Sequence, residues 1–292
     1  WINANGIVQW GSDGLYVCNA FGDQANPVIL CIGPRRGIIA WEDFRDLDPN
    51  ELDIFAQKVD NGAVSWTHDG IPVADAPGLQ YEPHFAAAAD GAFVVWRDGR
   101  DPEEPLNHDI YVQRFDQNGN PAWIANGIPI CTTPGFQASP RVTVDGAGGI
   151  YVVWVDGSGD DYDLHGQRLD AGGNPLWNPQ GVVVSEALGD QDLPELLLNG
   201  DHVLLAWEDT RNGGNELDIY ASRLTSAGTV AIEDVVPESA PGIAPNQLVV
   251  AGLANVMAVD ILQLGEIEPA RRFVDVVDVE PLDGLLGGED LV

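Results

Sequence analysis

One pattern occurs four times along the chain, and this repetition is the strongest constraint on what it can fold into. Each copy opens on a tryptophan and continues with a glycine four residues later, a Gln-x-x-Pro segment and a second tryptophan. Repeats of this kind are supersecondary units that bury their apolar faces against one another. The opening residues are Trp10, Trp66, Trp123 and Trp177, at spacings of 56, 57 and 54 residues.

Each copy predicts four short β-strands. In the third copy, 139–145 and 149–155 are rich in β-branched residues and flank Asp145-Gly146, a hairpin signal. Residues 163–169 alternate, and the chain then turns into 174–184. Four antiparallel strands per copy, repeated around an axis, predict an all-β fold, a β-propeller of four clear four-stranded blades. An open array of sheets is the competing arrangement, but it would leave unpaired strand edges.

The repeat also sets the expected domain bounds. We assign 10–232 to the propeller repeats and 1–9, which match the end of a copy, to a closing strand that completes a blade of this chain or of a neighbouring one. Residues 233–292 lack the tryptophans, and they are either a degenerate fifth blade or a small separate β segment. The four repeats are 10–65, 66–122, 123–176 and 177–231.

The second tryptophan of each copy begins a Trp-x-Asp-x-Arg element, and a further aspartate closes the polar loop behind it. Ser158 replaces the arginine in the third copy. Seven of the 13 basic residues stand at repeated positions, and desolvated carboxylates need partners. We therefore interpret the element as structural ion pairing rather than as a reaction centre. Its residues are Trp41, Asp43, Arg45, Asp53, Trp96, Asp98, Arg100, Asp109, Trp154, Asp156, Asp163, Trp207, Asp209, Arg211 and Asp218.

The loop of the third copy is a candidate calcium site. Asp156, Asp160, Asp161 and Asp163 lie within eight residues of one another, and calcium takes several oxygen ligands from loops of this kind. The spacing is not that of an EF-hand, since no glutamate follows at the twelfth position. Ordinary solvated loop carboxylates are the alternative.

The charge balance restricts the partners. The chain carries 46 acidic and 13 basic residues, a formal net charge of −33. Binding to nucleic acid or to an anionic membrane relies on Lys and Arg, so we expect neither partner. No apolar run is long enough for membrane insertion. The chain opens on Trp1 rather than Met, which predicts a processed product or a fragment.

The three cysteines do not indicate a metal site. No Cys-x-x-Cys spacing is present, so a zinc knuckle is not expected. Cys18 and Cys31 either face each other across a strand pair as a disulfide or are small buried residues.

No catalytic motif stands out. The five histidines occupy unrelated repeat positions, and His-Glu-x-x-His, Gly-x-Ser-x-Gly and phosphate-binding glycine loops are absent. Two carboxylates could serve a glycosidase, but 46 acidic residues always place some pair close together. A hydrolase would need carboxylates that depart from the repeat and converge on the central channel. The tryptophans are expected in the core between blades, with sugar stacking as the alternative.

The unit W-x-D-x-R…D-I-[YF]-x-Q-[RK]-x-D…G…W resembles the repeats of secreted bacterial β-propeller-type proteins, over residues 1 to about 232. The Ser-x-Asp-x-Gly-x-Thr-Trp box of sialidases, which are enzymatic propellers, is missing. The resemblance implies an extracellular or cell-surface location with interaction or assembly roles, in a group largely without assigned activity.

These observations lead us to predict a non-enzymatic extracellular scaffold that associates with itself. It would be a self-assembling subunit of a surface filament or layer built by strand exchange. A glycan-binding propeller module is the alternative, and a polysaccharide hydrolase is the third hypothesis.

Overall fold

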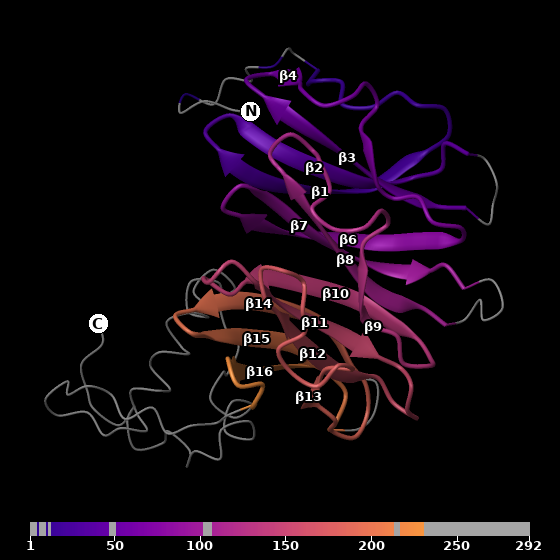
Figure 1. The fold of residues 1–292 in the computed structure, drawn as a ribbon. Helices are drawn as coiled ribbons and strands as arrows, with labels where there is room; N and C mark the ends of the chain where they lie inside the picture. The colour runs from indigo at the N-terminus through magenta and orange to yellow at the C-terminus, as the bar shows by residue number, and fades with distance from the viewer. Residues whose placement is uncertain are drawn as a thin grey trace, which may run out of the picture.

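Four antiparallel β-sheets follow one another along the chain in the computed structural model (Figure 1). None of the described residues lies in a helix, so none forms a helix long and apolar enough to cross a membrane. The prediction of an all-β propeller with four blades is confirmed. The expected closing strand 1–9, apart from Asn5, and the segment 233–292 lie outside the described residues. The structure describes residues 5, 10, 13–46, 51–101, 107–212 and 217–230.

Within each sheet the strands are arranged in chain order, so that each blade is a meander. The first blade comprises β1 (Gln24–Gly33), β2 (Arg36–Asp43), β3 (Asp53–Asp60), β4 (Ala63–Val64) and β5 (Ile71–Ala74), the last two both paired with β3. The second comprises β6 (Leu79–Ala88), β7 (Gly91–Gly99), β8 (Asp109–Asp116) and β9 (Ile128–Cys131). The third comprises β10 (Gln137–Val144), β11 (Ile150–Asp156), β12 (Asp163–Leu169) and β13 (Val182–Ser185). The fourth has three described strands, β14 (Gln191–Asn199), β15 (His202–Asp209) and β16 (Asp218–Thr225).

Each of the first three blades takes its last strand from the start of the following repeat. A buried glutamine on the third strand holds the chain segment that leads from one repeat into the next. Gln57 on β3 donates from Nε2 to the Thr67 carbonyl at 2.7 Å and accepts the Trp66 backbone N–H at 2.9 Å. Gln113 and Gln167 make the same pair of bonds in the next two blades. The chain therefore passes the opening tryptophan before it returns to the sheet.

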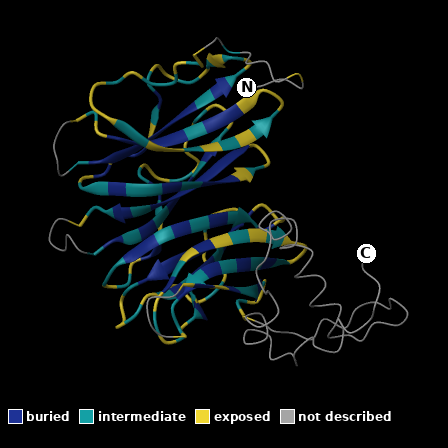
Figure 2. Ribbon diagram, turned by 180° about the vertical axis from the view of Figure 1, so that it is seen from behind, coloured by how far each residue is buried: buried dark blue, intermediate teal, exposed yellow. Residues whose placement is uncertain are grey.

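The apolar core lies between consecutive blades, where dark blue central strands face one another in Figure 2. Trp96 on β7 packs into the first blade, and Trp154 on β11 packs into the second; both are fully buried. This arrangement confirms the predicted face-to-face stacking of the repeats. A glycine lies against each ring: a Cβ on Gly181, whose φ is +88°, would approach Trp154 Cη2 to 2.7 Å.

The first strand of every blade contains a β-bulge at the residue before its proline. The bulged residues all have left-handed backbone conformations, which only glycine adopts without strain. Strands β1, β6, β10 and β14 lie next to one another in turn, so the bulges gather where the blades meet. The bulged residues are Asn26, Glu82, Ser139 and Leu193, with φ of 48°, 55°, 49° and 49°.

The three cysteines are free thiols. Cys18 is half-buried and Cys31 is exposed, so these two residues form no disulfide, and Cys31 is not a core residue. Cys131 is buried at the end of β9, where it packs in the core between the second and third blades.

Trp96→Ala should lower the free energy of unfolding by about 3–5 kcal/mol, because it removes a fully buried indole and leaves a cavity between two blades. Ile29→Ala is the matched control, since Ile29 is 74% exposed, and we expect a change within about 0.5 kcal/mol. Urea denaturation followed by tryptophan fluorescence measures both. Equal effects at the two positions would show that the blades do not depend on this packing.

Candidate functional site

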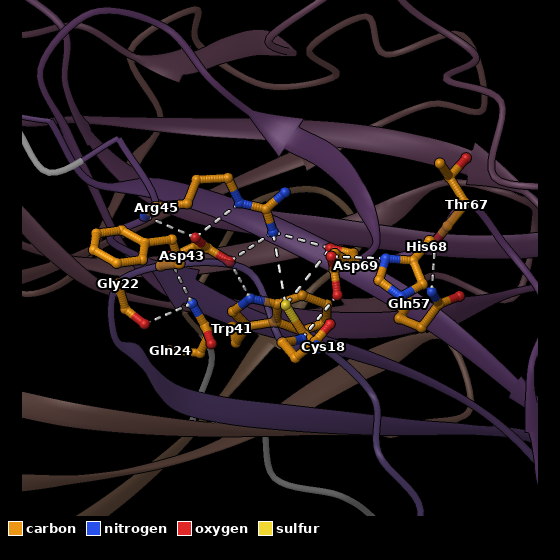
Figure 3. A network of polar contacts seen from close by, with 12 residues as sticks. Cys18, Gly22, Gln24, Trp41, Asp43, Arg45, Gln57, Thr67, His68 and Asp69 are labelled. Carbon is orange, nitrogen blue, oxygen red and sulfur yellow. Dashed lines mark hydrogen bonds and ion pairs between the residues drawn. The ribbon is translucent and has the colours of Figure 1, made fainter.

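The Trp-x-Asp-x-Arg element folds into a closed polar network at the edge of the core, shown for the first blade in Figure 3. Asp43 is buried, and its Oδ2 accepts the Trp41 indole N–H at 2.7 Å and Arg45 Nη2 at 2.8 Å. Its Oδ1 accepts the backbone N–H of Arg45 at 3.0 Å and Nε at 2.9 Å. The guanidinium lies 3.4 Å from the Phe55 ring centroid and also donates to the Asp69 carbonyl at 2.9 Å.

The second and fourth blades repeat this network. Asp98 accepts the Trp96 indole N–H at 2.7 Å and the Arg100 side chain at 2.6 and 2.8 Å. In the fourth blade the Arg211 guanidinium covers the Tyr220 ring at 3.9 Å. In these blades the polar atoms of the element are bonded to one another, and the structural interpretation of these residues stays a prediction. Trp207 and Asp209 complete the fourth network.

The third blade departs from this pattern. Ser158 has no side chain long enough to reach back, and only its backbone N–H binds Asp156, at 3.0 Å. Asp156 Oδ2 instead accepts the Thr133 hydroxyl at 3.4 Å. The Trp154 indole N–H is buried and has no hydrogen-bond partner among the described residues.

The loop-closing aspartates stand directly opposite the motif aspartates on the neighbouring strand, as Asp53 does opposite Asp43. Burial and the nearby carboxylate of Asp46 raise the pKa of Asp53 to about 7. Burial and Asp98 raise the pKa of Asp109 to about 6. Burial raises the pKa of Asp163 as well, and Asp218 accepts the Asn212 amide at 2.8 Å.

The four carboxylates of the candidate calcium site have separate surroundings. Asp161 accepts the Gly189 backbone N–H at 2.9 Å, whereas Asp156 is bound to Ser158 and Thr133. Across the described parts of the chain, no three His, Cys, Asp or Glu side chains are grouped as metal ligands would be. Calcium binding by Asp156, Asp160, Asp161 and Asp163 stays a prediction.

A second group of polar residues lies where the first strands of the blades meet, and we call it the inner-edge cluster. Glu42 on β2 accepts the Asn26 amide at 2.6 Å and the Glu82 backbone N–H at 3.0 Å. Glu82 in turn accepts the Ser139 backbone N–H at 2.7 Å, and the Ser139 hydroxyl donates to Asp192 at 3.3 Å. One chain of hydrogen bonds thus crosses all four blades. The cluster comprises Asn26, Glu42, Glu82, Arg97, Ser139 and Asp192.

Arg97 links the cluster to a group of rings. Its Nη1 lies 3.5 Å from Glu82 Oε1, and its guanidinium lies 4.4 Å from the Phe136 ring and 5.0 Å from the Tyr81 ring. Burial and Arg97 lower the pKa of His108 to about 4. His108 is therefore neutral at pH 7, and its Nδ1 accepts Arg97 Nη2 at 3.2 Å.

The position two residues after each bulge also holds a different residue in every blade. Arg141 pairs with Glu195 at 3.1 Å across the third and fourth blades. His84 Nδ1 accepts the Val142 N–H at 3.4 Å. Burial and Arg141 lower the pKa of His84 to about 4, so it too is neutral at pH 7.

Sequence reasoning missed the inner-edge cluster. The bulged position precedes the proline of each Gln-x-x-Pro segment and holds Asn, Glu, Ser and Leu in the four copies. Glu42 and Arg97 occupy the middle position of Trp-x-Asp, which also varies. Variable positions inside a strict repeat were therefore the signal that could have located these residues.

Comparison with known proteins gives similarity in three dimensions only. No protein-family model matches the chain, and no curated protein matches its sequence. A GH43 endo-arabinanase from Bacillus licheniformis is 15% identical, with 71% of this chain and 76% of that chain covered and a TM-score of 0.40. An endo-arabinase from Bacteroides thetaiotaomicron is 12% identical, with coverages of 75% and 85% and a TM-score of 0.45. A family 117 glycoside hydrolase from Zobellia galactanivorans is 10% identical, with coverages of 74% and 74% and a TM-score of 0.44.

These similarities contradict our prediction of a non-enzymatic structural protein, a self-assembling filament or layer subunit, because the structures in question are glycoside hydrolases. At these identities the similarity is one of fold. The residues on which the prediction was based explain why it was wrong. It rested on the unmatched segment 1–9, the divergent tail and the absence of catalytic motifs, and it took no account of the polar residues at the inner edges, which differ from blade to blade.

Asp98→Asn should cost about 3 kcal/mol of stability, because it leaves the Arg100 guanidinium without its buried counter-charge. Asp156→Asn is the matched change in the blade that lacks the arginine, and we expect about 1 kcal/mol there. Chemical denaturation of the two variants measures the difference. Equal costs would mean that the arginine adds nothing to the network.

The raised pKa of Asp53 predicts a pH dependence of stability. The folded state holds this proton more tightly than the unfolded chain, whose carboxyl titrates near 4. The contribution of Asp53 is therefore fully present below about pH 4 and is lost as the pH rises through its folded pKa of about 7. Asp53→Asn should flatten the fall in unfolding free energy between about pH 4 and 7.

The control for this change is Asp116→Asn. Hydrogen bonds from Asn120 lower the pKa of Asp116 to about 2, so its contribution is lost only as the pH falls below about 4. Urea denaturation from pH 4 to 8 compares both variants with the parent chain. An unchanged slope in Asp53→Asn would show that another group carries it.

Proposed function

We propose that this protein is a glycoside hydrolase that cleaves a polysaccharide at the inner-edge cluster, with Glu82 and Asp192 as its carboxylate pair. One observation carries the proposal: these carboxylates, from the second and fourth blades, meet at the same residue of the third. Ser139 donates its backbone N–H to Glu82 at 2.7 Å and its hydroxyl to Asp192 at 3.3 Å. Neither carboxylate occurs at its position in any other repeat.

Glycoside hydrolysis needs two such carboxyl groups on opposite sides of the scissile bond. One protonates the departing oxygen, and the other activates water or attacks the sugar carbon. Glu82 is paired with Arg97 at 3.5 Å, and this suits the anionic member. Asp192, whose Oδ1 accepts the Leu193 N–H at 2.6 Å and which is partly exposed, is assigned the other role, that of the proton donor.

Glu42 is a positioning residue in this proposal. It is 5% exposed and accepts both the Glu82 N–H and the Asn26 amide. These bonds hold the strained bulge at Glu82, where the backbone φ of 55° would otherwise be unfavourable. The rings of Tyr81 and Phe136 beside Arg97 offer apolar faces to a sugar. An extracellular location and a glycan partner fit this function.

Glu82→Gln and Asp192→Asn test the pair. If the parent chain releases reducing ends from one member of a panel of neutral and acidic polysaccharides, each variant should lose about 100-fold or more in kcat, because each removes one proton-transfer group. Circular dichroism and thermal unfolding verify that both variants fold.

Asp201→Asn is the control, since the Asp201 side chain is 92% exposed on a turn outside the cluster, and its rate should equal that of the parent. Glu42→Gln should lower kcat by about 10-fold with little change in the pH profile. Binding of a polysaccharide without any turnover, or full activity in Glu82→Gln, would refute the assignment.

A further inference from the structure

The third blade lacks the arginine that the other three blades insert between the motif tryptophan, the motif aspartate and an aromatic ring. We propose that the third blade binds a guanidinium group from outside the chain at this position, between Asp156, Trp154 and His165. The site lies in the motif network, and the proposal is independent of the hydrolase function.

The other blades show what a guanidinium contacts here. It binds both oxygens of the motif aspartate, stacks on the ring of Phe55, Tyr111 or Tyr220 at 3.4, 3.7 or 3.9 Å, and donates to a backbone carbonyl or a hydroxyl. The arginine side chains remain 21–27% exposed, so the position opens to solvent.

The third blade keeps most of these partners. Asp156 is 3% exposed, and its Oδ2 lies 3.9 Å from His165 Nδ1, but no arginine or lysine of the described residues is bound to it. The ring position is taken by His165, which lies 6.2 Å from Trp154 between ring centroids. The carbonyl position of Asp69 and Asn126 falls on Gln180 in the repeat. Ser158 is short and exposed, so its side chain does not fill the place that the arginine takes in the other blades.

Two buried groups at this place have polar atoms without partners among the described residues. The Trp154 indole N–H is one of them; in the other blades the same N–H is bound to the aspartate. The other is Gln137, paired with Asp156 in the strand register, whose amide nitrogen and oxygen are both unpartnered. Gln80 and Gln191 leave only the oxygen unpartnered, because their amide nitrogens bind loop carbonyls. The unusual polar groups thus coincide with the missing arginine.

A planar guanidinium suits Asp156, the His165 ring and the Gln137 amide oxygen better than a metal ion does. Its forked N–H donors match both oxygens of a carboxylate and its face stacks on a ring, whereas the described residues here present no set of three metal-ligating side chains. When it binds, Asp156 Oδ2 can turn from Thr133 to Trp154, as in the other blades. The net charge of −33 favours the approach of any cation.

Titration of the intact chain with methylguanidinium, followed by calorimetry and by 15N–1H spectra of the indole groups, tests the site. We expect one saturable site per chain and a downfield shift of one indole proton, assigned to Trp154 through Trp154→Phe. The melting temperature should rise by about 2–4 °C at ten times Kd. Methylammonium is the control, and it should bind at least 10-fold more weakly because it has no planar fork.

A peptide Gly-Arg-Gly, capped at both ends, distinguishes the source of the group. Tighter binding of the peptide than of methylguanidinium indicates an arginine of a partner polypeptide, and the reverse order indicates a free guanidino compound. Either result supports the site.

Ser158→Arg should abolish binding, because it supplies the guanidinium from within the chain as the other blades do. Arg211→Ser should raise the stoichiometry from one to two, since it recreates the same opening in the fourth blade. Asp156→Asn should also abolish binding, and it replaces Ser158→Arg as the test if that variant does not fold. The proposal would be overturned if the parent chain showed no saturable binding or if binding persisted in Ser158→Arg.

Discussion

The bond from a buried tryptophan to a buried aspartate two residues later is the interaction on which the first, second and fourth blades depend. The indole of Trp96 fills the space between two blades, while its N–H holds the carboxylate of Asp98 at the end of the same strand. That carboxylate then fixes the backbone and side chain of the following arginine. Core and loop are therefore ordered together, since a carboxylate buried without these donors would be costly.

The regular part of this structure follows from local sequence. Residues 163–169 alternate in the sequence and form β12 with the same bounds. The last strand of the third blade differs from its prediction. The predicted run 174–184 contains a turn around Trp177, and the strand itself is short, Val182–Ser185. The reason is Gln167, whose amide binds both sides of that turn. Such a bond between a side chain and a distant loop has no periodicity that a sequence pattern could reveal.

The candidate site was beyond sequence reasoning for a different reason. Glu82 and Asp192 are more than 100 positions apart in the sequence, and they meet only because four bulges bring the first strands together with left-handed residues. The repeated Gln-x-x-Pro segment is visible in the sequence, but the residue in front of its proline differs in every copy. In a repeat protein, the positions that are identical in every copy hold the blades together, whereas the positions that differ can carry the chemistry of a site.

Ser158 and His165 are also positions at which one copy departs from the repeated motif. Where the arginine is absent, the ring that it would cover has also changed, from Phe or Tyr to His. The loss is compensated only in part among the described residues. The Thr133 hydroxyl and His165 Nδ1 both approach Oδ2 of Asp156, at 3.4 and 3.9 Å, and the indole N–H of Trp154 has no partner. A buried donor left unpaired costs about 1–3 kcal/mol, which the other three blades avoid. A guanidinium bound in the place of the arginine would let Asp156 accept the Trp154 N–H, as in the other blades, and would so remove this penalty.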